Sequence, residues 1–383
     1  MKSRRLRAAG RSGLIALVVA LAGFAFFGGS AQAASSPVHY VALGDSYSAA
    51  SGVLPLDPMA PPQCLRSTRN YPHVLAEKTG AKLTDVTCGA ADTTHFFTAQ
   101  YPGLKPQLDA LKPDTELVTM TIGGNDSGVF INAILSCGSA GLSTLGMGSP
   151  CKDQYGSSFE DTIRNTTYPS LVKALGAVRD KAPKARVAIL SYPWITPRTG
   201  GCFPTMPVAE GDIPYVRSLQ TTLNYAVRRA AEATGVTFVS LNSVSEGHDA
   251  CKPIGTRWVE PVLLGTNPVI VHPNALGESK MAEQTIKVLS EVPGNPLPSG
   301  APETTIRKLV VKKDKRKATF RFTSNVTGST FRCKLDNRRF RSCRSPRAYK
   351  GLKPGRHRFQ VVAIDSTGQT DPTPATKKFR IVR

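Results

Sequence analysis

The stretch Val38-His39-Tyr40-Val41-Ala42-Leu43-Gly44-Asp45-Ser46 decides the fold of this 383-residue chain. Its mostly apolar part, Val38–Leu43, predicts a short buried strand. The strand ends abruptly in Gly-Asp-Ser, so it delivers a serine to the rim of a sheet, where open α/β sheets bind their ligands. Ser46 is therefore a candidate nucleophile, and the rest of the chain has to supply a base and an oxyanion hole.

Strand patterns and helix patterns alternate downstream of Ser46. This alternation predicts a parallel sheet covered by helices on both faces, and five strands favour a doubly wound, flavodoxin-like order. Residues 136–157 are rich in Gly, Ser and Cys and predict a disulfide-pinned loop, and residues 242–271 predict an irregular segment. The expected strands are Val38–Leu43, Leu83–Thr87, Glu116–Ile122, Arg186–Ser191 and Val236–Leu241, and the main expected helices are Tyr71–Lys78, Phe159–Lys181, Ile213–Thr234 and Ala275–Leu289.

Four positions at the ends of these elements have complementary chemistry. Ser46, Gly89 and Asn125 follow the first three strands, and His272 opens the last helix. In a parallel sheet such positions lie at one edge. The Ser46 hydroxyl would attack an acyl carbon, and His272 would accept its proton and return it to the leaving alcohol. The backbone N–H groups of Ser46 and Gly89, with the Asn125 amide, would hold the oxyanion.

The blocks Gly44-Asp45-Ser46-Tyr47, Gly89, Gly123-Gly124-Asn125-Asp126 and His272-Pro273 resemble, in order, those of the SGNH (GDSL) hydrolase family. The cysteine placement and the Gly247-His248 stretch resemble the secreted actinobacterial lipases and esterases of that family. The resemblance covers roughly residues 37–290 and implies a three-layer α/β/α fold that cleaves ester or lipid substrates through Ser46, Gly89, Asn125 and His272, with no metal or cofactor. The G-x-S-x-G elbow of other lipases is absent around Ser46, which disfavours an α/β-hydrolase.

The sequence departs from the family at the triad acid. The family usually places Asp three residues before the catalytic histidine, and Val269 stands there. Some relatives orient the histidine with the main-chain carbonyl two residues before it, which here belongs to Ile270. We expect this carbonyl to orient His272, with Asp249 or Glu260 as the alternative.

The N-terminal segment and the cysteines both indicate that the protein is exported. Residues 1–33 combine a basic start, an apolar run and Ala31-Gln32-Ala33, which predicts a signal peptide and secretion; a retained anchor is the alternative. Eight cysteines, none in a C-x-x-C pair, fit an oxidising compartment and disfavour zinc. The sequence leaves their connectivity open, and sequential pairing is the simplest: Cys64–Cys88, Cys137–Cys151, Cys202–Cys251 and Cys333–Cys343.

The net charge of +22 is concentrated at the C-terminus. Residues 1–33 carry +5, residues 34–302 carry −1 and residues 303–383 carry +18. We expect a catalytic domain over 34–290, a Pro-rich linker over 291–305 and a basic β-sandwich over 306–383. The last segment resembles the immunoglobulin-like modules of bacterial surface proteins. Its charge favours an anionic cell-envelope polymer or lipid surface over nucleic acid in a secreted protein.

We therefore predict a secreted, monomeric serine ester hydrolase. Two rivals remain, a polysaccharide O-acetyl esterase and a catalytically inactive surface-binding protein. Arg66 and Arg69, which lie between the serine block and the first expected helix, are most simply solvated charges.

Overall fold

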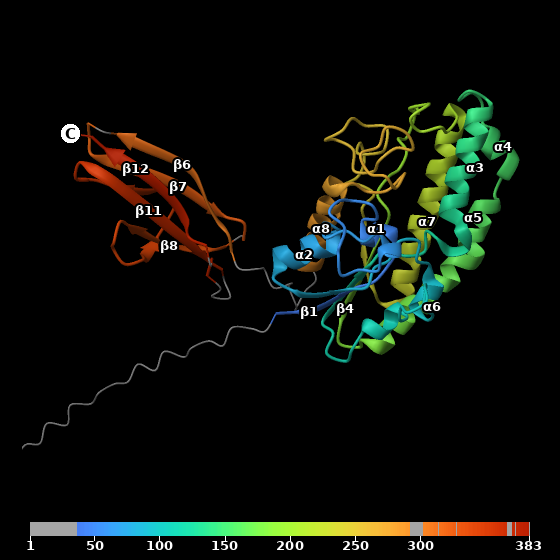
Figure 1. Ribbon diagram of the computed structural model, residues 1–383, viewed down its shortest axis with the longest axis horizontal. Helices are drawn as coiled ribbons and strands as arrows, with labels where there is room; N and C mark the ends of the chain where they lie inside the picture. Colours follow the sequence, from blue (N-terminus) through green and yellow to red (C-terminus); the bar gives the residue numbers. More distant parts are fainter. Residues whose placement is uncertain are drawn as a thin grey trace, which may run out of the picture. The chain divides into compact units, whose positions relative to one another are not determined.

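The computed structural model describes residues 37–291, 302–312, 314–326, 328–365, 370–371 and 373–382 (Figure 1). The predicted signal peptide and residues 292–301 of the predicted linker lie outside these described residues. Within the described ranges, the helices are all too short or too polar to cross a membrane.

The catalytic region is built on a five-stranded parallel sheet. Its order, β2-β1-β3-β4-β5, is the predicted flavodoxin-like order. The carboxyl ends of the strands therefore meet at one edge, where Ser46 follows β1. The strands are β1 His39–Ala42, β2 Lys82–Asp85, β3 Leu117–Met120, β4 Arg186–Leu190 and β5 Thr237–Val239.

Helices cover both faces of this sheet, which gives three layers (Figure 1). On one face, Val41 and Val118 pack with residues of α6 (Tyr168–Lys181) and α7 (Ile213–Thr234). On the other face, Tyr40 and Leu117 pack with residues of α2 (Tyr71–Thr79) and α8 (Ala275–Ser290). The helices α2, α7 and α8 agree with the sequence prediction to within one residue.

The disulfide-pinned loop predicted over residues 136–157 is only partly right. The disulfide is present, but residues 136–143 form the second half of α3 (Val129–Ser143) and a further helix, α4 (Pro150–Tyr155), follows the connecting turns. Glycine and serine weaken helix propensity, but Cys137 and Cys151 are fully buried against α7 and are bonded to each other, so tertiary packing overrides propensity.

The helix predicted over Phe159–Lys181 is interrupted. It consists of α5 (Ser158–Thr162), a π-helical turn (Ile163–Thr167) and α6, whose second residue is a proline. Proline cannot donate an intrahelical hydrogen bond, which accounts for the altered turn at this point.

The C-terminal region is all-β, as predicted. Its two antiparallel sheets have the orders β10-β7-β6 and β12-β11-β8-β9, and they share an apolar core in which the rings of Phe320 and Phe359 stack 3.9 Å apart. The first strand begins two residues before the expected domain start, and the assignment to the immunoglobulin-like class stays a prediction. The strands are β6 Thr304–Lys312, β7 Lys317–Ser324, β8 Thr330–Leu335, β9 Arg341–Cys343, β10 Arg347–Tyr349, β11 Gly355–Ile364 and β12 Ala375–Ile381.

All eight cysteines are paired in the sequential order that the sequence analysis preferred. The bonds are Cys64–Cys88, Cys137–Cys151, Cys202–Cys251 and Cys333–Cys343.

Candidate active site

Ser46 lies at a sharp strand-to-helix turn. It is the first residue of the short helix α1 (Ser46–Ala49), and the side chain of the capping residue Asp45 accepts a hydrogen bond from Tyr47 N at 3.0 Å. Gly44 makes the turn with a φ of +124°, and a Cβ there would lie 2.4 Å from Thr121 O, so only glycine fits. The Ser46 N–H, in the first turn of the helix, has no intrahelical acceptor.

The imidazole of His272 connects Ser46 to the backbone of its own loop. His272 Nε2 lies 2.7 Å from Ser46 Oγ, and His272 Nδ1 lies 2.7 Å from the carbonyl oxygen of Ile270. Because a carbonyl oxygen only accepts, Nδ1 carries the proton, which leaves Nε2 as an acceptor for the serine hydroxyl. This is the contact that the sequence analysis expected for Ile270.

The residue between Ile270 and His272 has an unusual backbone conformation. Val271 has a φ of +57°, a left-handed conformation that is an outlier for a β-branched residue. Such a conformation costs about 1–3 kcal/mol. The Val271 carbonyl accepts a 2.6 Å hydrogen bond from the buried Tyr47 hydroxyl. Tyr47, the residue after Ser46, therefore holds the turn that places the Ile270 carbonyl beside His272. The sequence analysis missed this role.

Neither alternative carboxylate approaches the imidazole. Asp249 accepts from Cys251 N at 3.0 Å. Glu260 pairs with Arg257 at 2.6 Å and accepts from Asn274 Nδ2 at 2.7 Å. Since Asn274 caps α8, Glu260 supports the start of the helix that follows His272. The main-chain carbonyl is thus the only partner of His272 Nδ1 among the described residues.

Burial shifts the pKa values of both His272 and Asp45. It lowers the pKa of His272 from 6.5 to about 4, against the smaller opposing effect of the Ile270 carbonyl. It raises the pKa of Asp45 to about 6, although Thr121 and Tyr192 donate hydrogen bonds to this carboxylate. The histidine is therefore neutral, and competent to accept a proton, far into the acidic range.

The segment after β2 differs from the sequence expectation. The Gly89 N–H is already engaged, since it donates to Cys64 O at 2.9 Å, so it is not the free oxyanion donor that we expected. A Cβ on Gly89 would lie 2.8 Å from Ser51 Oγ, which explains the glycine by close packing. The next residue, Ala90, is exposed with a φ of +62°, and within residues 37–291 its N–H has no acceptor.

Asn125 lies against the same segment. Its Nδ2 donates to Ala91 O at 2.9 Å, which uses one of the two amide hydrogens and leaves the other available. The preceding Gly124 N–H donates to the Tyr192 hydroxyl at 2.9 Å, and that hydroxyl in turn donates to Asp45. The asparagine block and the serine block are therefore joined through one buried tyrosine.

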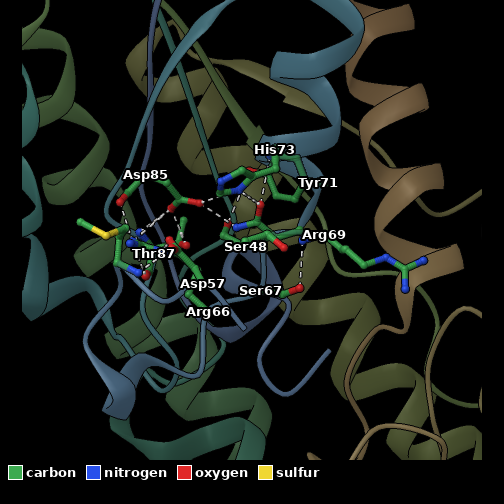
Figure 2. A network of polar contacts seen from close by, with 12 residues as sticks. Ser48, Asp57, Arg66, Ser67, Arg69, Tyr71, His73, Asp85 and Thr87 are labelled. Carbon is green, nitrogen blue, oxygen red and sulfur yellow. Dashed lines mark hydrogen bonds and ion pairs between the residues drawn. The ribbon is translucent and has the colours of Figure 1, made fainter. Parts of the chain in front are cut away.

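A network of ion pairs and hydrogen bonds holds the chain at Asp85 and Thr87, just before Gly89 (Figure 2). Arg66 is only 8% exposed and donates to Asp57 at 3.1 Å and to the Asp85 carbonyl at 2.5 Å, so the expectation that it is a solvated charge is wrong. Arg69 is exposed, as expected. Because Arg66 lies two residues after Cys64, the network fixes both the Cys64–Cys88 bond and the carbonyl that holds Gly89.

A small apolar cavity of about 40 Å³ lies between α3 and α7. Phe130 lines it and packs edge-on against His272, with ring centroids 6.2 Å apart. In the described part of the chain, no cluster of His, Cys, Asp and Glu side chains is arranged to hold a metal ion.

A flavodoxin-like sheet with this Ser–His pair at its carboxyl edge defines the class of SGNH-type ester hydrolases. More specifically, the chain belongs to the GDSL-like Lipase/Acylhydrolase family, whose sequence model matches residues 42–280. It is 62% identical to Lipase 2 of Streptomyces coelicolor over 263 residues, which cover 68% of this chain and 89% of that protein.

Solved structures of two Streptomyces enzymes are similar. The extracellular lipase of Streptomyces rimosus matches with a TM-score of 0.56 and 29% identity, covering 66% of this chain and 99% of that one. Phospholipase A1 of Streptomyces albidoflavus matches with a TM-score of 0.55 and 26% identity, with the same coverage of 66% and 99%.

Proposed function

We propose that this ester hydrolase works through an acyl-enzyme on Ser46 with His272 as its only side-chain base. The Ser46 oxygen attacks the acyl carbon while its proton passes to His272 Nε2. As the tetrahedral intermediate collapses, the ester C–O bond breaks and His272 returns the proton to the leaving alcohol. Water then attacks the acyl-enzyme by the same steps. The observation that carries the proposal is the 2.7 Å contact between Ser46 Oγ and His272 Nε2.

The oxyanion hole in this proposal consists of the Ser46 N–H, the free hydrogen of the Asn125 amide and the Ala90 N–H. Ala90 takes the place expected for Gly89, whose N–H is occupied by the Cys64 carbonyl. The support is that Ala90 is exposed and that Asn125 hydrogen-bonds to Ala91, the residue next to it. Three neutral donors suit a charge that exists only during the reaction.

Labelling by a fluorophosphonate tests the nucleophile. We expect stoichiometric labelling of the full chain, no labelling or ester hydrolysis by Ser46→Ala, and normal behaviour of Ser158→Ala, which removes an exposed serine at the start of α5. Turnover that survives in Ser46→Ala would overturn the assignment. A wild-type protein that neither reacts nor hydrolyses would favour the inactive surface-binding alternative.

We further propose carboxylic esters of lipids as the substrates. Support comes from the similarity to two lipases and a phospholipase A1, and from the apolar cavity beside Phe130. The cavity is small, so a long acyl chain has to follow the surface or displace side chains. Rates on p-nitrophenyl esters from acetyl to palmitoyl, on a phospholipid and on acetylated xylan test this. A preference for acetylated xylan would replace the proposal with the O-acetyl esterase alternative.

We also propose that the chain is exported, that it is a monomer and that its β-sandwich binds anions. Four disulfides with no free cysteine support secretion into an oxidising medium. The charge of +18 over residues 303–383 supports attachment of the β-sandwich to an anionic cell-envelope polymer or lipid surface. Mass analysis of the exported chain tests cleavage after Ala33, and sedimentation velocity tests the monomeric state.

A further inference from the structure

The β-sandwich contains a cleft lined by basic side chains, with a volume of about 550 Å³. Its lining residues come mainly from strands β8, β9 and β10 and from the turn between β8 and β9, and they include the Cys333–Cys343 disulfide. None of the residues that line it is Asp or Glu. We call this site the arginine cleft; its basic residues are Lys334, Arg338, Arg339, Arg341 and Arg347.

Two of the cations of the cleft lie over aromatic rings. Arg347 lies over the ring of Tyr349 at 5.3 Å, and the Lys334 ammonium lies over the ring of Phe340 at 4.7 Å. The carboxylate of Asp336, in the turn beside the cleft, pairs with His357 at 2.8 Å. Aromatic rings thus position two of the five cations, and the lining of the cleft offers an excess of positive charge to a ligand.

A second, mainly basic hollow has a volume of about 810 Å³, and Asp336 is the one carboxylate in its lining. Both hollows are bordered by Asn337, which lies in the turn after β8. Here β11 and β12 place like charges directly opposite each other, Arg356 beside Arg380 and Arg358 beside Lys378. Such pairs destabilise a sheet, so their presence favours a role in binding negative charge.

We propose that these two hollows together bind a linear polymer that carries an oxyanion in each repeat. The proposal rests on the anion binding proposed above for the sandwich and assigns it a site. Guanidinium groups match phosphate and carboxylate oxygens with two parallel hydrogen bonds, and arginine is the commonest basic residue in both hollows. Two hollows that share Asn337 in their linings suit an extended chain better than a single small anion.

The sandwich surface favours a polymer over a membrane. Proteins that lie on lipid usually insert large apolar side chains beside their basic residues. Among the described residues of the sandwich, Val310 and Val382 are the only large apolar side chains that are substantially exposed, and neither lines the two hollows. The contact with the ligand is therefore ionic, and it should weaken steeply with salt.

The test uses the full secreted chain and three probes: polyphosphate, polyglutamate and vesicles containing phosphatidylglycerol. The variant Arg338→Gln, Arg341→Gln, Arg347→Gln removes three cations of the arginine cleft. The matched control, Lys308→Gln, Lys312→Gln, Arg321→Gln, removes three exposed cations of β6 and β7 that line neither hollow. Thermal melts and ester hydrolysis confirm that both variants are folded.

We expect the wild-type chain to bind at least one polymer and the cleft variant to bind it roughly 100-fold more weakly at low salt, with the control little changed. The affinity for polyphosphate, compared with that for polyglutamate, shows whether phosphate or carboxylate is preferred. Equal losses in both variants would overturn the assigned site while leaving anion binding by the sandwich intact. Binding to vesicles but to neither polymer would overturn the polymer, and binding to no probe would overturn the proposed anion binding itself.

Discussion

The pH dependence of hydrolysis follows directly from how His272 is held. A base oriented by a carbonyl has no negative charge to stabilise its protonated form, and burial lowers the pKa of His272 from 6.5 to about 4. This difference corresponds to about 3 kcal/mol against protonation in the folded protein. Lowering the pH should therefore leave kcat/KM unchanged until the pH approaches 4, where the base becomes protonated and activity falls.

The same shift has a consequence for stability, and its sign is opposite to that of a salt-bridged histidine. Between pH 6.5 and about 4 the unfolded chain binds a proton that folded His272 refuses. The His272 contribution to stability should therefore decrease by up to about 3 kcal/mol as the pH falls through this window, and it stays lost below it. The raised pKa values of Asp45 and Asp126 act in the opposite direction over the same window. The loss due to His272 is therefore measured as the difference between the wild-type chain and His272→Gln in urea unfolding at pH 7 and pH 4.5.

The assay is a profile of kcat/KM against pH on a soluble ester, which reports the free enzyme. Because Asp45 also titrates, with a pKa of about 6, an NMR titration of the His272 ring is needed beside the profile, with His272→Gln to assign the signal. A ring that titrates at or above 6.5 would refute the reasoning. It would show that a carboxylate supports the imidazole in solution.

Three further predictions concern the surroundings of the serine. Asn125→Ala should lower kcat by about 10²–10³ with little change in KM, since the amide acts on charge that develops in the transition state; an effect confined to KM would contradict this role. Arg66→Met should lower the free energy of unfolding by about 3–5 kcal/mol, because it leaves Asp57 and Asp85 without their buried cation, whereas Arg69→Met, at an exposed position, should change it by less than about 0.5 kcal/mol in the same urea titration. Reduction should lower the melting temperature and activity together, and thiol counting on the unfolded, unreduced chain should find no free cysteine.

Much of the fold was predictable because its signals are local and repetitive. Apolar runs that end in Gly-Asp-Ser or Gly-Gly-Asn mark strands buried on both faces, and α7 combines helical spacing with a final glycine. The prediction failed at α3, where glycine and serine obscured a helix stabilised by burial against α7. It also failed at Arg66, because the acids that pair with it lie nine and nineteen residues away and only the fold brings them together.

The site was predictable in its residues but not in its backbone. Each candidate side chain follows a strand or opens a helix, so position and chemistry together point to Ser46, Asn125 and His272. The hydrogen bond that occupies the Gly89 N–H depends on the Cys64 loop, and the left-handed turn at Val271 runs against the preference of valine. Neither has a sequence signal, because both are imposed by tertiary contacts.

The loss of the triad acid is compensated by two cross-links between the serine loop and the histidine loop. Tyr47, next to the nucleophile, donates to the Val271 carbonyl at 2.6 Å. Asn267 donates to Ser51 O at 3.0 Å and to Pro273 O at 3.2 Å. These bonds fix the backbone on both sides of His272, and a fixed backbone is what a carbonyl needs in order to orient an imidazole. In the proposed mechanism a strained turn thereby replaces the requirement for a charged side chain, and burial of the imidazole lowers the pKa of the base.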